Sequence, residues 1–406
     1  MRIRLMAILA ALVISGCSTL SPPAAPPSRP LVLLVSIDGF RSDYLDRGLT
    51  PTLARLAQEG ATGPMEPSFP SKTFPNHYTL VTGLRPDHHG IVNNTMEDPA
   101  MPGVTFRLSD RAAVADRRWW EGGEPIWVTA EKAGIPTAPL FWPGSEAAIH
   151  GVRPRDWLSF EQGMGGDARV DQLLAWLDRP ADDRPGFGTL YFDSVDTAGH
   201  RFGPDSAEVN AAVASVDASM ARLLAGLRER GLADRVVLVV VADHGMAAIS
   251  PDRVVRLGPV TASEAARVIF SGAILGVEPQ PGYERQVRAE LLTVHDHMQC
   301  WERGHLPPRL AFGTHRRVPA IVCLAETGWE ILAPDQTAWT GGDHGYDNAA
   351  PEMQALFIAH GPGVVPGRQI SSLRNVDVHA LLGQLLGLTL PADDGDDRLV
   401  QAGLHP

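Results

Sequence analysis

Acidic and imidazole side chains follow several apolar segments of this sequence, each at the point where the segment ends. They are Asp38 after residues 31–37, Asp196 and His200 after residues 188–193, and Asp243 and His244 after residues 236–242. A further histidine, His344, lies between glycines in the stretch 342–345. Oxygen and nitrogen ligands of this kind, without cysteine, suit Zn²⁺ or a similar divalent cation. Taken singly, each Asp also fits a helix cap, and each Asp-His-Gly also fits a turn.

If these apolar segments are strands of one open sheet, their carboxyl ends meet at one edge, where ligands bind. The joint position of the acidic and imidazole groups then predicts a metal site at that edge. Asp196 and His200 are four residues apart, so they approach one another only if their segment forms about one helical turn.

A second candidate for chemistry is Thr73, in the stretch 69–78 with the sequence FPSKTFPNHY. The pattern predicts a turn that leads into a helix, so the Thr73 hydroxyl would face free backbone N–H groups and the positive end of the helix dipole. Such a hydroxyl could act as a nucleophile that accepts a phosphoryl group, provided that a base or a metal removes its proton. An ordinary helix-capping threonine is the alternative. Lys72 beside it could attract phosphate or pair with an acidic neighbour.

The elements that position these residues follow from the apolar pattern. Near-continuous apolar runs, typical of strands buried on both faces, occupy residues 31–37, 137–142, 188–193, 236–242 and 354–360. Segments with apolar spacing of three and four, typical of helices, occupy residues 50–60, 124–134, 170–180 and 206–231. The alternation predicts a doubly wound α/β sandwich with a central, mostly parallel sheet over residues 31–390. Residues 246–343 break this rhythm, which predicts an inserted cap region, and residues 391–406 are expected to form a C-terminal tail.

Composition limits the function classes. The 406 residues are 44% hydrophobic and 20% charged, which is a globular composition and excludes disorder, collagen and coiled coil. Beyond residues 5–16 no long apolar run is present, so a multi-span membrane protein is excluded. The net charge of −12 and the absence of Lys/Arg runs speak against coating of nucleic acid, but they are compatible with one small phosphate site.

The N-terminus has the pattern of an export signal. Residues 1–16 combine a basic start with a short apolar core, and the sequence ISGC that ends at Cys17 resembles a bacterial lipobox, whose cysteine is lipidated. We therefore expect a signal peptide over residues 1–16 and a lipidated, Ser/Pro/Ala-rich tether over residues 17–30. The expected location is the periplasm, anchored through the lipid, with Ser18 favouring the outer membrane. Ordinary cleavage that leaves Cys17 as a plain thiol is the alternative.

Two further pairs leave alternatives open. Cys300 and Cys323 could form a disulfide in an oxidising compartment or stay as separate buried thiols. His295 and His297 could bind another metal ion, although solvated loop histidines are commoner.

Taken together, seven motifs resemble those of the nucleotide pyrophosphatase/phosphodiesterase family of the alkaline phosphatase superfamily. They are SIDGFR (36–41), FPSKTFPNHYTLVTG (69–83), HGIVNN (89–94), FWPGSE (141–146), DTAGHRFGP (196–204), ADHGM (242–246) and GDHGYDN (342–348). The resemblance runs in order from about residue 31 to 390, and the N-terminus suggests a bacterial lipoprotein member. It implies an alkaline phosphatase-like fold.

The resemblance also implies an enzyme with two Zn²⁺ ions that hydrolyses nucleotide diesters and pyrophosphates and releases nucleoside 5′-monophosphates. One zinc would be held by Asp196, His200 and His344, and the other by Asp38, Asp243 and His244 together with the oxygen of Thr73. Thr73 would attack phosphorus and form a phosphothreonine. Asn94 and the backbone N–H of Thr73 would donate hydrogen bonds to a non-bridging phosphate oxygen.

In this family the position after the nucleophile lines a slot for a nucleobase, which implies that Phe74 stacks on the base. Trp157 and Tyr191 are weaker candidates for the opposite wall, and ordinary packing is the alternative for all three rings. The expected partner is a small nucleotide or another phosphodiester, with membrane contact only through the lipid. Alternatives for the function are hydrolysis of phospholipid headgroups or phosphonates, and a non-catalytic periplasmic binding lipoprotein.

Overall fold

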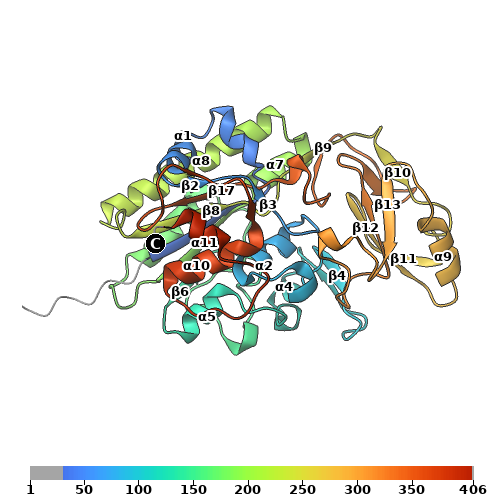
Figure 1. Cartoon of the computed structure of the whole chain (residues 1–406), viewed down its shortest axis with the longest axis horizontal. Coiled ribbons are helices and arrows are strands. Elements are labelled where there is room, and N and C mark those ends of the chain that lie inside the picture. The colour runs from blue at the N-terminus through green and yellow to red at the C-terminus, as the bar shows by residue number, and fades with distance from the viewer. Residues whose placement is uncertain (1–30, 405–406) are drawn as a thin grey trace, which may run out of the picture.

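A computed structural model describes residues 31–404 and places one central sheet between two layers of helices (Figure 1). The sheet has seven strands in the order β18–β2–β17–β8–β1–β7–β6. Its parallel centre consists of β8 (Val236–Val241), β1 (Leu31–Ile37), β7 (Phe187–Phe192) and β6 (Thr137–Pro139). At the other edge, β17 (Phe357–His360) runs antiparallel to both neighbours, followed by β2 (Ala61–Thr62) and β18 (Arg368–Gln369). The predicted α/β sandwich with a mostly parallel sheet is confirmed.

Helices cover both faces of this sheet. One layer consists of α1 (Pro51–Glu59), α6 (Gly166–Leu177) and α8 (Ala207–Glu229), and the other of α2 (Thr73–Thr82), α5 (Ile126–Lys132), α10 (Val378–Leu386) and α11 (Arg398–Gly403). The segment expected to be a C-terminal tail therefore packs on the domain as far as residue 404, because α11 buries Leu399 beside α10. None of the helices within residues 31–404 is long and apolar enough to cross a lipid bilayer.

Strand β1 decides where the site lies. All seven of its residues are buried, and it pairs with β8 on one side and β7 on the other. Ser36 lies opposite Val241 and Tyr191, so the three parallel strands end at the same level. Because they end together, the residues that follow them meet at one edge of the sheet. Asp38 follows β1, Asp243 lies just beyond the end of β8, and helix α7 (Ser194–Phe202) begins just beyond the end of β7.

The region that interrupts the strand–helix rhythm forms a sheet of its own, at the right of Figure 1. Its antiparallel strands are β11 (Ala266–Phe270), β12 (Ile274–Pro279), β14 (Ile321–Ala325) and β13 (Met298–Glu302), with helix α9 (Glu284–Leu291) beside them. Cys300 and Cys323 face each other on β13 and β14 and are joined as a disulfide, which decides between the two alternatives for this pair. The region leaves and re-enters the larger domain through β9 (Ala247–Ile249) and β16 (Gly341–Asp343), which pair with each other.

Short elements connect the larger ones. They are the strand pairs β3 (Met65–Glu66) with β19 (Leu373–Arg374), β4 (Thr95–Glu97) with β5 (Thr105–Arg107) and β10 (Val254–Arg256) with β15 (Glu330–Leu332), and the helices α3 (Pro86–His89) and α4 (Arg111–Ala115).

The inserted region is attached to the larger domain by a cluster of charges, which we call the Asp98 clasp (Asp98, Arg316 and Arg317); Asp98 and Arg317 are buried, and Arg316 is exposed. Arg316 donates two hydrogen bonds of 2.8 Å to Asp98, and Arg317 donates one of 2.7 Å. Arg317 also donates to the carbonyl oxygen of Gly90 at 2.8 Å. The clasp thus holds both ends of segment 90–98, which contains Asn94, one of the predicted site residues.

The signal peptide, the tether and the lipidated Cys17 expected from the sequence lie outside the described residues.

Candidate active site

The predicted metal ligands form two groups at the carboxyl edge of the parallel strands. The first group is Asp196, His200 and His344, and the second is Asp38, Asp243 and His244. Within each group the ligand atoms all lie within 4.8 Å of one another. Among residues 31–404 these are the two sets of three or more such side chains that meet in this way. The expected pairing of Asp196 with His200 holds because their segment is helical, as α7.

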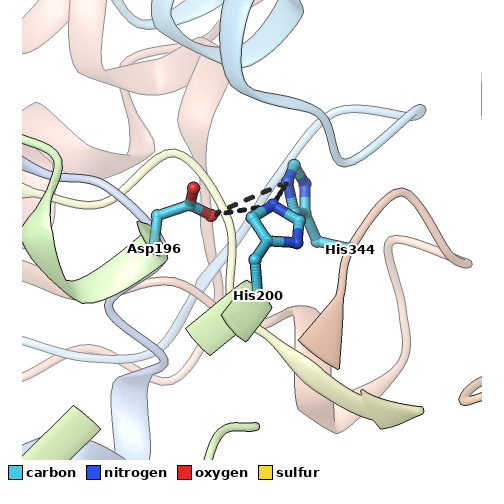
Figure 2. A group of neighbouring side chains, drawn as sticks. All are labelled: Asp196, His200 and His344. Atoms are coloured by element: carbon cyan, nitrogen blue, oxygen red, sulfur yellow. Dashed lines mark hydrogen bonds and ion pairs between the residues drawn. The ribbon is translucent and has the colours of Figure 1, made fainter. Parts of the chain in front are cut away.

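Figure 2 shows the first group, in which an Asp196 oxygen and two imidazole nitrogens point toward a common centre. Asp196 Oδ1 lies 3.5 Å from His200 Nε2 and 3.7 Å from His344 Nε2, and the two nitrogens are 3.1 Å apart. A tetrahedral zinc ion with ligands at about 2.0–2.1 Å separates those ligands by about 3.3–3.4 Å. The triangle therefore has the dimensions that such an ion requires.

The second group is fully buried. His244 Nε2 lies 2.9 Å from Asp243 Oδ2 and 3.5 Å from Asp38 Oδ1. The hydroxyl oxygen of Thr73 lies 3.2 Å from the same nitrogen, at a distance that suits a fourth ligand. The ring of His244 stacks on that of His344 at 3.5 Å, so the two groups adjoin each other.

The hydrogen bonds of the three imidazoles show which nitrogen is free for a cation. Each Nδ1 lies 2.8–2.9 Å from a backbone carbonyl oxygen, which can only accept, so each Nδ1 carries the proton. Each Nε2 of a neutral ring then presents a lone pair. Between His200 and His344 two lone pairs face each other at 3.1 Å, which is unfavourable unless a cation lies between them.

The carboxylates of the two groups point to the same conclusion. Asp38 Oδ1, Asp196 Oδ1 and Asp243 Oδ2 are buried and have no hydrogen-bond partner among the described residues. Burial, together with the carboxylates of Asp243 and Asp196, raises the pKa of the Asp38 carboxyl well above its usual range. Buried acceptors normally find partners, so these three oxygens fit the donor set of divalent cations.

Thr73 is the first residue of α2, but its hydroxyl does not cap the helix. Lys72 occupies the capping position, and no side chain makes the capping hydrogen bond there. The helix-capping alternative is therefore not what this structure contains, because the hydroxyl faces His244 instead. His77 donates from Nδ1 to the carbonyl oxygen of Thr73 at 2.9 Å and accepts from the Ser36 hydroxyl at 2.8 Å, which is a structural role.

The segment before Thr73 is bound directly to the segment around His344. His344 donates to the carbonyl oxygen of Ser71, whose hydroxyl donates to the carbonyl oxygen of Tyr346, both at 2.8 Å. Lys72 pairs with Asp343 at 3.0 Å, so of its two alternatives the acidic neighbour is the one observed. The position of Thr73 is thus coupled to the position of a candidate ligand.

Asn94 lies where it can contact a bound phosphate. Its Oδ1 accepts a hydrogen bond of 2.9 Å from the backbone N–H of Phe74, which orients the side-chain amide. The residue lines the same cavity as Thr73. Because Oδ1 is engaged, the NH₂ group remains as the donor of this side chain.

A cavity of about 520 Å³ opens onto both groups. Its aromatic lining residues are Phe74, Phe141, Trp142, Phe160 and Tyr191. Tyr191 also donates from its hydroxyl to Asp38 Oδ2 at 2.6 Å, so it orients a candidate ligand as well as lining the cavity. This second contact has no signature in the sequence.

Trp157, the other residue expected on the opposite wall, is not among the residues that line this cavity. Its ring lies 5.1 Å from the guanidinium carbon of Arg153, against which it packs. Phe160 lines the cavity instead, and its backbone N–H donates to the buried Glu146 carboxylate at 3.0 Å. Sequence reasoning missed Phe160, because nothing in this irregular segment distinguishes one aromatic residue from the other.

The histidines of the inserted region form no further metal site. His297 pairs with Glu326 at 2.7 Å and stacks on Trp329 at 3.6 Å, and it belongs to neither of the two groups.

Each group is expected to hold one divalent ion. Replacing His344 by Ala removes one of three ligands from the first group, so the purified variant should contain about one metal ion fewer per chain than the unaltered protein. Metal analysis by mass spectrometry measures this. His297→Ala is the control and should keep the full metal content. An unchanged content in His344→Ala would contradict the assignment of the first group.

Comparison with known proteins places this geometry in a family. The family model described as type I phosphodiesterase/nucleotide pyrophosphatase matches residues 32–347. The human ectonucleotide pyrophosphatase/phosphodiesterase family member 1 is 34% identical over 395 residues, which are 93% of this chain and 42% of that protein. The bis(5′-adenosyl)-triphosphatase of Xenopus laevis is 33% identical over 370 residues, which are 91% of this chain and 80% of that protein. The chain thus spans less than half the length of the human relative.

A solved structure supports the same placement. The murine ectonucleotide pyrophosphatase/phosphodiesterase 5, as an inactive threonine-to-alanine variant in complex with AMP, superposes with a TM-score of 0.88 and 33% identity. The match covers 93% of this chain and 100% of that chain. The chain therefore belongs to the type I phosphodiesterase/nucleotide pyrophosphatase family of enzymes and has its alkaline phosphatase-like fold.

Proposed function

We propose that this protein is a di-zinc phosphodiesterase/pyrophosphatase that cleaves nucleotide phosphodiester and phosphoanhydride bonds through a phosphothreonine and releases nucleoside 5′-monophosphates. One observation carries the proposal. The hydroxyl of Thr73 lies 3.2 Å from His244 in the second of two adjoining Asp/His groups, at one end of an aromatic-lined cavity. Zinc is proposed because both groups combine nitrogen and oxygen ligands at tetrahedral spacing and leave a position open.

The chain's own residues support a reaction in which the following bonds form and break in turn. Thr73 loses its hydroxyl proton to solvent, and its oxygen forms a bond to phosphorus while the bond from phosphorus to the leaving oxygen breaks. The leaving group takes the electron pair and gains a proton from solvent. A water molecule then adds to phosphorus, the bond to the Thr73 oxygen breaks, and Thr73 regains its proton as the nucleoside 5′-monophosphate departs.

Two further features favour this chemistry. Asn94 would donate a hydrogen bond to a non-bridging oxygen, which gains negative charge in the transition state. When bound, the divalent cations supply the positive charge that favours the ionised Thr73 hydroxyl and offsets the charge of the phosphoryl and leaving oxygens.

Nucleotides are the proposed substrates. Phe74 lines the cavity directly beside Thr73, with Phe160 as a further aromatic residue of the lining. The murine relative binds AMP, and the Xenopus relative is named for a dinucleotide substrate. Hydrolysis of phospholipid headgroups or phosphonates, and non-catalytic binding, remain the alternatives that the experiments below separate.

The nucleophile is tested by substitution of Thr73. Thr73→Ala should lower the rate on a chromogenic diester such as bis(4-nitrophenyl) phosphate by roughly 10⁴-fold or more, because no other side chain replaces the attacking oxygen. Asn94→Ala should cost about 2–4 kcal/mol of transition-state stabilisation, or roughly 30- to 1,000-fold in rate. Thr293→Ala, at an exposed loop of the inserted region, is the control.

A Thr73→Ala protein with normal metal content and undiminished diester hydrolysis would exclude Thr73 as the nucleophile. If both the unaltered protein and the Thr73→Ala protein failed to hydrolyse any diester, the non-catalytic binding function would replace this proposal.

The nucleobase slot is tested with Phe74 and Trp157, one inside the cavity and the other outside it. Phe74→Ala should raise KM for a nucleotide diester by roughly 5- to 150-fold, the loss of about 1–3 kcal/mol of stacking, and should leave a phosphocholine diester unaffected. Trp157→Ala should change neither substrate. A larger effect of Phe74→Ala on the phosphocholine diester would favour the phospholipid alternative.

The proposal includes location. The lipobox-like sequence at Cys17 supports a lipid anchor in the periplasm, on the outer membrane in view of Ser18. Cys17→Ser should move the protein from the membrane fraction to the soluble fraction of a bacterial host, as seen by immunoblotting. A variant that stays in the membrane fraction would show that Cys17 is not the anchor.

A further inference from the structure

A buried acidic side chain of the inserted region belongs to neither metal group. Glu330, the first residue of β15, is 2% exposed. Its Oε1 accepts a hydrogen bond of 2.9 Å from the hydroxyl of Tyr346, whereas its Oε2 is buried and has no donor among residues 31–404. Because a carboxylate oxygen without a donor is costly to bury, the surroundings of Oε2 decide the state of this group.

Glu330 Oε2 lies beside the carboxylate of Asp343. A hydrogen bond joins these two carboxyl groups. A Cβ atom at Gly272 would lie 3.1 Å from Asp343 Oδ2 and 3.4 Å from Glu330 Oε2, so both oxygens border the same small space. Two ionised carboxylates cannot form a hydrogen bond with each other, because both only accept. One of the two groups therefore carries a proton.

The donors around each group show which one is protonated. Asp343 Oδ1 accepts from Lys72 Nζ at 3.0 Å and from the backbone N–H of His344 at 2.8 Å. Asp343 Oδ2 accepts from the backbone N–H of Ala273 at 3.3 Å, whereas Glu330 receives a single donor within residues 31–404. A cation and several donors favour the ionised form, so Asp343 is the carboxylate and Glu330 is the acid. Burial, together with the Asp343 carboxylate, also raises the pKa of Glu330.

Asp343 connects this pair to the segment of the proposed nucleophile. Lys72, which pairs with Asp343, directly precedes Thr73. A Cβ atom at Gly345 would lie only 2.4 Å from Lys72 Cε, so the aliphatic part of Lys72 packs on the backbone of Gly345. Lys72 is thus held along its stem and at its charged end. This restricts the backbone at the start of α2, where the Thr73 hydroxyl lies 3.2 Å from His244 and a displacement of about 1 Å would slow the reaction.

We infer that Glu330 is a positioning residue for the proposed nucleophile: its protonated carboxyl group donates to Asp343, which fixes Lys72 and with it the start of α2. The inference rests on the proposed function and extends it, because it assigns to the inserted region a side chain on which attack by Thr73 depends. Glu330 acts through other residues and takes no part in the bonds that form and break.

The test replaces Glu330 by two residues of similar size. Glu330→Gln keeps both contacts, because its NH₂ group can donate to Asp343 and its oxygen can accept from Tyr346. Glu330→Leu removes both. With bis(4-nitrophenyl) phosphate, Glu330→Leu should lower kcat by roughly tenfold, as expected for the loss of a buried hydrogen bond to a charged group, with KM within about twofold and the metal content unchanged. Glu330→Gln should stay within about twofold of the unaltered protein.

A double-mutant cycle tests the route through Lys72. Lys72→Met keeps most of the aliphatic stem but loses the charge that reaches Asp343. If Glu330 acts through Lys72, adding Glu330→Leu to Lys72→Met should lower kcat by less than about twofold further. Glu290→Leu is the matched control. It removes another carboxylate of the inserted region, one that accepts from two backbone N–H groups, and it should leave kcat unchanged.

A second measurement does not depend on the folding of Glu330→Leu. The charged and titratable groups around Glu330, in the described part of the chain, are Asp343, Lys72, Tyr346 and Arg253. Glu330→Gln leaves these four in place and removes only the acid. Loss of the Glu330 proton brings two carboxylates together, so the local arrangement is lost as the pH rises through the raised pKa of Glu330. The ratio of kcat in Glu330→Gln to kcat in the unaltered protein should therefore rise from neutral to alkaline pH.

Several results would overturn the inference. They are an undiminished kcat in Glu330→Leu, an equal loss in Glu330→Gln or in the control Glu290→Leu, additive effects in the cycle, and a kcat ratio that does not change with pH. A loss in Glu330→Leu that is accompanied by loss of a metal ion would also overturn it, because Glu330 would then act through His344. An unaltered protein that fails to hydrolyse the diester would instead refute the proposed function, which distinguishes the two failures.

Discussion

The structure depends on one electrostatic constraint. Carboxylates and imidazole nitrogens that repel one another are held together at the carboxyl edge of the central sheet. Three buried carboxylate oxygens have no hydrogen-bond partner within residues 31–404, and two imidazole lone pairs face each other at 3.1 Å. Separated from water, such groups are costly unless a positive charge lies among them. The register of β1 with its neighbours and the carbonyl partners of each Nδ1 prevent the groups from moving apart. The fold is therefore built around the cations that it is expected to bind.

The inserted region is part of this construction and not a separate lid. Its return strand β16 leads directly into His344, while Ser71 and Lys72 bind the backbone and side chains around that residue. At its other contact, the Asp98 clasp holds the segment that carries Asn94. Thr73 and Asn94, the proposed nucleophile and oxyanion donor, are thus both supported by contacts between the inserted region and the larger domain.

The pattern of strands buried on both faces was sufficient to predict the sheet and the edge at which the Asp and His side chains meet. The division of those side chains into two groups came from the resemblance to the motifs of the family. It was not sufficient for details that depend on long-range packing. Asp98 and Arg317 lie 219 positions apart, and no local pattern links them. Phe160 lines the cavity and Trp157 does not, and the backbone N–H of Phe160 donates to Glu146, 14 positions away. Irregular segments have no periodicity from which such a contact could be inferred.

The position of His344 in the chain has a consequence for biosynthesis. Five of the six candidate ligands precede the inserted region, and the last follows it by a single residue beyond β16. A ribosome that has produced everything up to His244 has therefore made a complete second group but an open first one. The first group is complete only when about a hundred further residues have been synthesised and His344 has folded back to the edge of the sheet beside Thr73. A chain that ends before His344 could therefore form the second group but not the first.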